Sequence, residues 1–363
     1  MPLNPVTIWR FNDLPMKQPA FWIALLSALF FGAATPISKP LLDHLTGYQL
    51  AGLLYLGAAI GVALLVIRER QFKPPWRMDA KNRLRLLGAV FFGGIIGPLA
   101  LLAGLRLASA ASVSMWLNLE MVATAVLGHL IFKDHLTPRS WLAAGGILLA
   151  ALILAAGEGA AGLLAGLLVA LACLCWGMDN HLTALIDGIT PAQSTLWKGL
   201  AAGTTNLIIG LALAPLTAPV GSVFGGLGVG VVSYGLSIVL YISSAQQLGA
   251  TRSQLIFSSA PFWGVLLSVV LLGEAFTWQH GLAAGLFVLS IALLFQEQHA
   301  HVHAHWEQEH EHRHAHSDGH HTHTHAGEAV PEWHSHPHLH TAQTHAHSHW
   351  PALHHRHTHQ AES

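Results

Sequence analysis

The chain has 363 residues, of which 52% are hydrophobic and only 10% are charged, and its formal net charge is −1. Soluble domains carry roughly 25% charged residues, so this composition excludes an ordinary soluble domain and indicates a membrane protein. The average covers two unlike parts, because residues 19–296 are almost all apolar whereas residues 299–363 hold 23 of the 28 histidines.

Ten apolar segments are long enough to cross a bilayer, which takes about 20 residues. The first segment is too long for the core of a signal peptide, so we expect it to be retained. The predicted spans are 19–39, 48–67, 86–105, 108–132, 140–157, 161–186, 192–214, 222–246, 253–272 and 278–296. The sequence therefore predicts an all-α polytopic membrane protein with ten transmembrane helices.

Pairs of glycines spaced four residues apart recur in these spans and would let helices approach closely in lipid. The pairs are Gly57/Gly61, Gly93/Gly97, Gly162/Gly166, Gly199/Gly203, Gly226/Gly230 and Gly281/Gly285.

The loop between the second and third predicted spans, RERQFKPPWRMDAKNRLR, carries seven of the 17 Lys and Arg residues. The positive-inside rule places such a loop in the cytoplasm. With ten spans, the N-terminal segment 1–18 and the C-terminal tail then also lie in the cytoplasm. We therefore expect a multi-pass protein of the inner or plasma membrane.

The chain repeats itself at an offset of 140 to 145 residues. LAAGGILLAALIL (142–154) matches LAAGLFVLSIALLF (282–295), KDHLT (133–137) matches GEAFT (273–277), and FGAATPISKPLLD (31–43) matches WGMDNHLTALID (176–187). Each half, 19–157 and 161–296, holds five predicted spans. Because five is odd, the second half is expected to be inserted with the opposite orientation, and such inverted repeats are typical of secondary transporters.

The paired five-helix repeats, the WG early in the first helix of a repeat and the GE-x-hydrophobic-T before its last helix resemble the EamA-type family of the drug/metabolite transporter superfamily. The resemblance covers roughly residues 20–296 and implies a ten-helix carrier that works by alternating access without an ATP-binding site. Two positions depart from the pattern: Phe31 stands where the second half has Trp176, and Glu120 is followed by Met121 rather than by proline. The histidine-rich tail is not part of the family pattern.

Four polar or aromatic residues form a stripe on the sixth predicted span. At 100° per residue, Trp176, Asp179, Asn180 and Thr183 fall within an arc of about 100°. Charged residues inside a membrane are costly and usually functional, so we expect this stripe to line the transport path. His181 lies roughly 100° beyond the arc, and we expect it to make an interhelical hydrogen bond rather than to bind a ligand.

Glu120 is the second carboxylate inside a predicted span, on a stripe with Trp116 and Thr124. Lys198 is a basic candidate on the seventh span. We include these with the stripe above as candidate substrate-binding residues. Trp116 and Trp176 suit packing in the core as well as a place in the wall of the site.

Structural interpretations of the charged residues remain open. Asp179 could pair with Lys198 and lock two helices together, and Glu120 could pair with Lys39 or with Asn118. Pro36, at the position in the first repeat that matches the histidine of the second, is expected to break the first helix and free carbonyls.

The tail 297–363 contains six clusters of alternating histidine and almost no aliphatic residues, so we expect it to be disordered. Imidazole binds Ni, Zn, Co and Cu, and metal must compete with protons near pH 6.5. The candidate metal ligands are His299, His301, His303, His305, His310, His312, His314, His316, His320, His321, His323 and His325. No zinc-finger spacing is present, and the alternative is a pH-sensitive polar tail that binds metal incidentally.

The sequence predicts a secondary transporter that moves a small metabolite or similar solute, outward, with proton coupling through Asp179 or Glu120 as an option. Two alternatives remain: an exporter of Ni, Co or Zn that gathers metal with its tail, and a metal-responsive membrane protein. Few metal ligands lie in the predicted spans, which disfavours the exporter.

The chain shows no nucleotide loop, nucleophile elbow or metalloprotease motif, so we expect no enzymatic activity. The expected partners are the lipid bilayer, a small-molecule substrate and transition-metal ions at the tail. We expect no required cofactor and no nucleic-acid partner, and a homodimer is among the oligomeric states that the sequence allows.

Overall fold

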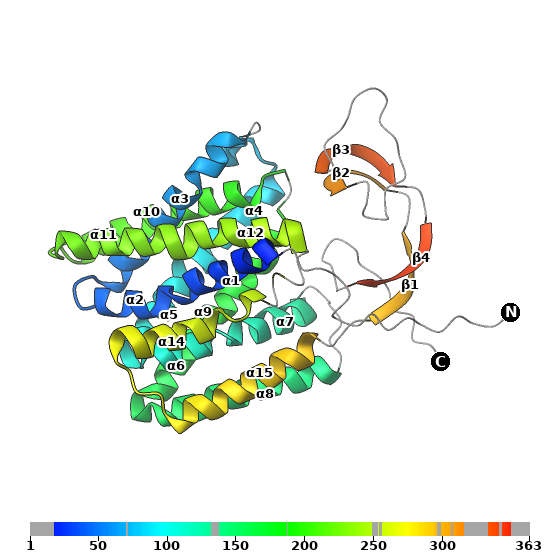
Figure 1. Cartoon of the computed structure of the whole chain (residues 1–363). Coiled ribbons are helices and arrows are strands. Elements are labelled where there is room, and N and C mark those ends of the chain that lie inside the picture. The colour runs from blue at the N-terminus through cyan, green and yellow to red at the C-terminus, as the bar shows by residue number, and fades with distance from the viewer. Residues whose placement is uncertain are drawn as a thin grey trace. The chain divides into compact units, whose positions relative to one another are not determined.

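The computed structural model describes residues 18–69, 72–131, 138–186, 188–248, 253, 256–295, 299–305, 308–315, 333–340 and 343–349 (Figure 1). The chain divides into two compact units, Met1–Gln296 and Glu297–Ser363. The described part of the first unit is helical, whereas that of the second consists of strands. Residues 1–17 of the expected cytoplasmic N-terminal segment lie outside the described part.

The first half of the helical unit contains α1 (Gln18–Gly32), α2 (Ala34–Leu41), α3 (Gly47–Arg68), η1 (Pro75–Arg77), α4 (Ala80–Ala89), η2 (Val90–Ile96), α5 (Gly97–Leu107), α6 (Ala110–Trp116), α7 (Leu119–Ile131) and α8 (Pro138–Gly157). After η3 (Gly159–Ala161), the second half contains α9 (Gly162–Ala184), α10 (Pro191–Leu213), α11 (Val220–Val229), η4 (Gly230–Leu236), α12 (Ser237–Leu248), α14 (Ala260–Leu272) and α15 (Trp278–Phe295).

Eight of the predicted membrane spans appear as helices that are long and apolar enough to cross a bilayer. The last two appear, in the described residues, as the shorter apolar helices Ala260–Leu272 and Trp278–Leu293, so the count of ten is not confirmed. Residues 253, 256 and 257 are helical, a turn follows at 258–259, and α14 then begins at Ala260 with Pro261 in its first turn, where the missing amide proton has no cost.

The first predicted span has a local interruption between α1 and α2, one turn before the expected position, although Ala33 keeps helical backbone angles. The break lies at Ala33, and Pro36 is already inside α2. Proline has no amide proton, so it cannot complete the hydrogen bond to the carbonyl four residues earlier. The interruption that we assigned to Pro36 is therefore present but begins N-terminal to it.

Helices at matching positions in the two halves pack against each other or exchange equivalent partners. α3 packs on α10, α6 on α14, and α8 on α15, which lie side by side in Figure 1. α1 packs on α12 in the same way that α9 packs on α5. This exchange of partners is what two copies of one repeated unit would produce.

Two π-helices mark matching positions in the halves. η2 covers 90–96 and η4 covers 230–236, an offset of 140 residues. π-Helices are rare and occur mostly at functional sites, because the wider turn leaves backbone carbonyls without their usual partners. Hydropathy does not distinguish a π-turn from an α-turn, so the sequence did not predict them.

Glycines allow the central helices of the two halves to touch backbone to backbone. A Cβ on Gly199 of α10 would lie 2.7 Å from the carbonyl oxygen of Tyr55, and one on Gly230 would overlap that of Leu54. Dispersion at such contacts drives helix association in lipid. The predicted pair Gly281/Gly285 does not act in this way, since a Cβ on Gly285 would meet nothing within 4 Å.

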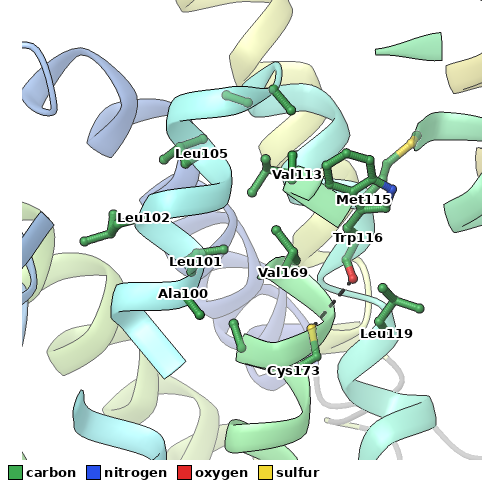
Figure 2. Packing of buried hydrophobic residues seen from close by; sticks show 14 of the residues in the cluster. Ala100, Leu101, Leu102, Leu105, Val113, Met115, Trp116, Leu119, Val169 and Cys173 are labelled. Atoms are coloured by element: carbon green, nitrogen blue, oxygen red, sulfur yellow. Dashed lines mark hydrogen bonds between the residues drawn. The ribbon is translucent and has the colours of Figure 1, made fainter. Parts of the chain in front are cut away.

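A core of buried apolar residues lies where α5, α6 and α9 meet (Figure 2). Its members are fully buried or nearly so, and they include Leu101, Leu102, Leu105, Val113, Met115, Trp116, Val169 and Cys173. The Cys173 thiol lies 3.7 Å from the carbonyl oxygen of Trp116. This packing fixes α6 against the helix that carries Asp179.

The described residues of the tail form two antiparallel pairs, β1 (His299–His305) with β4 (Gln343–His349) and β2 (Gln308–Ala315) with β3 (Trp333–His340). We expected disorder throughout, and that expectation is not confirmed. Its low hydrophobicity suggested disorder, but H-x-H also has the two-residue period of a strand.

Candidate functional site

A buried ion pair joins α9 to α10. The Lys198 ammonium lies 2.6 Å from Oδ2 and 2.9 Å from Oδ1 of Asp179. Thr183, one turn along α9, donates a further hydrogen bond of 2.9 Å to Oδ1. The Asp179 side chain is 9% exposed and that of Lys198 is 18% exposed. Removing two charges from water offsets much of their attraction, so such a pair adds little net stability.

The π-helix η2 passes directly beside this carboxylate. A Cβ on Gly93 would overlap its Oδ2 atom. Trp176 Nε1 donates a hydrogen bond of 3.1 Å to the Gly93 carbonyl, which also accepts one from the Tyr55 hydroxyl. Asn206 Nδ2 donates one of 2.9 Å to the Gly94 carbonyl. Side chains from α3, α9 and α10 thus converge on the carbonyls of one π-turn.

The second carboxylate lies at the start of α7 and faces α9. Glu120 accepts a hydrogen bond of 2.8 Å from Asn180 Nδ2, and Asn180 also lies 3.5 Å from the Thr124 hydroxyl. His181 Nε2 lies 2.9 Å from the Thr124 carbonyl oxygen. His181 therefore contacts the backbone of α7, while the adjacent Asn180 on α9 donates the hydrogen bond to the Glu120 carboxylate.

The structure brings most of the sequence-derived candidates together around α9. Asp179, Lys198 and Thr183 form one polar group, and Asn180 and Glu120 form the next. The ion pair that we raised as a structural alternative is present.

For three other residues the sequence left alternatives open, and the structure shows the following contacts. Trp116 is fully buried and donates a hydrogen bond of 3.0 Å to the Ala151 carbonyl of α8, so it packs in the core. Asn118 donates instead to the Met115 carbonyl. Lys39 contacts the start of α6 rather than Glu120.

Sequence reasoning missed a group of aromatic residues that joins α1, α3 and η4, although it had named Phe31. The rings of Tyr55 and Tyr234 lie 6.0 Å apart, and Phe31 lies 6.0 Å from Tyr234 and 5.3 Å from Phe257. Phe31 belongs to α1 and Tyr234 to η4. A signal was available: tyrosine is amphipathic, so its presence in an apolar span points to a hydrogen-bond partner. Asp179, Trp176 and Tyr55 thus lie against the π-helix of the first half, whereas Tyr234 in the π-helix of the second half contacts Phe31 and Tyr55.

A second polar group, which we call the α6 cluster, surrounds the first turn of α6. A helix leaves its first four amides without intrahelical partners. Two carboxylates satisfy three of them: Glu158 accepts from the Ser109 amide at 3.1 Å, and Glu274 accepts from the amides of Ala110 and Ala111 at 2.8 Å each. The fourth amide, that of Ser112, donates to the Ser109 hydroxyl.

Further side chains complete the α6 cluster. The hydroxyls of Ser109 and Ser112 donate to Glu158, and Ser112 also lies 3.1 Å from His280 Nε2. The Lys39 ammonium donates to the Ala108 carbonyl and lies 4.0 Å from Glu274. Burial alone would raise the pKa of Glu158, but the hydrogen bonds from the two serines outweigh it and lower the pKa below its ordinary value.

Within the described residues, no group of three or more His, Cys, Asp or Glu side chains is arranged to hold a metal ion. A groove of about 500 Å³ lies between α4 and α10 and is lined mainly by apolar side chains such as Leu86, Leu87, Val90 and Leu200. Leu87 is 59% exposed. The groove is therefore open to the outside of the helical unit at Leu87, and neither Asp179 nor Lys198 lines it.

A model of the EamA-like transporter family matches residues 18–156 and again residues 163–296. The chain belongs to this family. The double match coincides with the two halves that exchange helix partners. As an EamA-like transporter, the chain is a multi-pass membrane protein that works in a lipid bilayer on a small-molecule substrate.

One relative agrees with the assignment of this EamA-like transporter, and one solved structure shares its fold. It is 25% identical over 304 residues to an uncharacterized transporter of Methanothermobacter thermautotrophicus, with 77% of this chain and 87% of the relative covered. A solved structure, described only as the crystal structure of a protein, matches with a TM-score of 0.55 at 18% identity. The match covers 77% of this chain and 97% of the chain in that structure. This second likeness concerns the fold alone.

Proposed function

We propose that this EamA-like transporter is a secondary carrier that moves a small metabolite or similar solute, outward, by alternating access. Its central polar site comprises the Asp179–Lys198 pair and the carbonyls of η2. The observation that carries the proposal is a buried ion pair, of little net value for stability, packed against a π-helix where two halves of the protein meet.

The residues around η2 offer a solute several kinds of polar contact. The pair presents the carboxylate of Asp179 and the ammonium of Lys198. A cationic solute would compete with Lys198 for the carboxylate, and an anionic solute would compete with Asp179 for the ammonium. Asn206 is fully buried, and its Oδ1 atom has no hydrogen-bond partner among the described residues. It is therefore an acceptor suited to a donor group on the solute, because buried acceptors are costly to leave unpaired.

Proton coupling through the carboxylates is the mechanism that we favour. Protonation of Asp179 would remove the charge that holds Lys198, so a proton and a solute could exchange at this position. Carboxylates inside membrane proteins commonly serve as proton carriers. Glu120, held by Asn180 on the next turn of α9, is the second candidate for this role.

The membrane orientation follows from the basic loop. With residues 68–85 in the cytoplasm of a cell with an inner or plasma membrane, both termini are cytoplasmic and the α6 cluster faces outside. Alternating access then requires the contacts of the α6 cluster to break when the site opens outward. The second half is inserted inversely to the first, as its matching π-helix and exchanged helix partners suggest.

Metal export is the less favoured alternative. The described part of the helical unit offers no cluster of metal ligands along which an ion could move. His181 and His280 are each engaged in hydrogen bonds with neighbouring helices or turns. A metabolite carrier whose tail binds metal separately fits the structure better.

The test begins with a strain that lacks this protein, screened for sensitivity to a panel of metabolites and metal salts. Wild type should restore tolerance to at least one solute, Asp179→Asn should fail to restore it at equal membrane abundance, and His181→Gln should restore most of it. The neighbouring histidine is the matched control because it lies on the same helix but bonds to the backbone of α7. Full complementation by Asp179→Asn would overturn the proposed site.

A further inference from the structure

The strand register of the tail places histidine opposite histidine six times. In β1 and β4 the opposed positions are His299/His349, His301/His347 and His303/His345. In β2 and β3 they are His310/His338, His312/His336 and His314/His334. The partners lie far apart in the sequence, from 20 positions for His314/His334 (334 − 314) to 50 positions for His299/His349 (349 − 299). Each pair therefore joins histidines from two different H-x-H clusters.

The positions between these histidines carry none. On β1 they are Ala300, Val302 and Ala304, and on β4 they are Thr344, Ala346 and Ser348. On β2 and β3 they are Glu309, Glu311, Arg313 and Ala315, and Trp333, Ser335, Pro337 and Leu339. Because successive residues of a strand belong to opposite faces, each ladder has one face of histidine positions and one face without any.

Directly opposed positions of an antiparallel pair have Cβ atoms about 4.5–5.5 Å apart. Imidazole nitrogens bind metal at about 2.0–2.1 Å, so two histidines at opposed positions can share a single ion. The next position on the same face of a strand is roughly 6.6 Å further along, which favours one ion for each pair.

We propose that each opposed histidine pair of the tail is a two-imidazole site for a divalent late transition-metal ion, such as Ni²⁺, Zn²⁺ or Cu²⁺, with water in the remaining positions. The proposal does not depend on the transport function. It also changes the expected ligand set: histidines of β3 and β4, beyond residue 325, become partners of those in β1 and β2, while His316–His325 lie outside the described residues.

Nickel binding to the full-length protein in detergent tests the pairing through a cycle of variants. One variant replaces His299, His301 and His303 of β1 with threonine, a second replaces His345, His347 and His349 of β4, and a third combines all six. Threonine suits a strand and cannot bind nickel as imidazole does. Bound Ni²⁺ is counted by equilibrium dialysis at mildly alkaline pH, where the imidazoles are neutral.

If opposed histidines share ions, each triple variant should bind three fewer Ni²⁺ than wild type, and the six-fold variant should also bind only three fewer. A loss in the six-fold variant equal to the sum of the two triple losses would overturn the proposal, because it would show independent ligands. Unchanged binding in either triple variant would overturn it as well.

The chain supplies a matched control in the same strands. His305 lies opposite Gln343, and His340 lies opposite Gln308. Replacing both histidines with threonine should leave the number of bound Ni²⁺ ions unchanged, because neither has a histidine partner. A loss of two ions in this control would contradict the proposal, since unpaired strand histidines would then bind as well as paired ones.

Discussion

At the scale of single residues, the polar stripe on α9 was predictable and its surroundings were not. Helical periodicity placed Asp179 and Thr183 on one face, and charge alone singled out Lys198 as a partner. The contributions of Gly93 and Asn206 depend on a π-turn that brings backbone carbonyls to the carboxylate. Hydropathy carries no information about that turn.

Gly93→Ala should disturb the site directly, because the new methyl group would overlap the Asp179 carboxylate. Overpacking costs about 1–3 kcal/mol, so we expect a lower midpoint of thermal unfolding in detergent and a loss of transport. Gly145→Ala on α8 is the control, since its Cβ would meet nothing within 4 Å. Equal unfolding midpoints for the two variants would show that η2 can shift to accommodate the methyl group. This result would contradict the close packing of Gly93 against Asp179.

At the scale of elements, the first eight spans were predicted to within a few residues, apart from the earlier start of the third. Long apolar runs of this kind are seldom anything but membrane-spanning helices. The breaks inside spans were not predicted correctly, since they depend on local hydrogen bonding. The α6 cluster was also missed, although the GE motif before α15 contains its carboxylate Glu274. The motif singles out Glu274, but it does not show that the Glu274 carboxylate accepts from the amides of α6.

Glu274→Ala should loosen the outer end of α6. It leaves the amides of Ala110 and Ala111 without their acceptors, and each buried unpaired amide costs about 1–3 kcal/mol. A cysteine at Ser114, which is 1% exposed on α6, should then react faster with a membrane-impermeant thiol reagent added from outside.

The labelling is done in a background with Cys173 and Cys175 replaced by alanine. Asp43→Asn is the control, because Asp43 is an exposed carboxylate in the loop after α2, at the same end of the helical unit. We expect a rise of about fivefold or more for Glu274→Ala, the change that 1 kcal/mol produces, and none for Asp43→Asn. Equal rates in both variants would show that Glu274 does not hold this end closed.

At the scale of the whole molecule, the duplication was visible in the sequence and the arrangement of its copies was not. Offsets of 140 to 145 residues predicted two halves, and the family model matches each half separately. Which helices exchange partners depends on packing between distant segments. The tail was the reverse case: its composition suggested disorder, whereas its two-residue period is that of the strands in the structure.

Reporter fusions test the inverted arrangement. Fusions after residue 75 and at the C-terminus should report the cytoplasm, and a fusion at Pro219, between α10 and α11, should report the outside. The basic loop gives this orientation. A cytoplasmic signal at Pro219 would be incompatible with inverted halves.

The most direct test of the central claim separates the function of the Asp179–Lys198 pair from its contribution to folding. Flux of the solute identified by complementation is measured in proteoliposomes for Asp179→Asn, Lys198→Met and the double variant, together with the thermal midpoint of each. Removing one partner leaves a buried charge unpaired, while removing both does not, so the double variant should be more stable than either single variant. We predict that all three have lost most of their flux although the double variant is folded and stable. Recovery of wild-type flux in the double variant would contradict the account, because the pair would then serve only to hold α9 against α10.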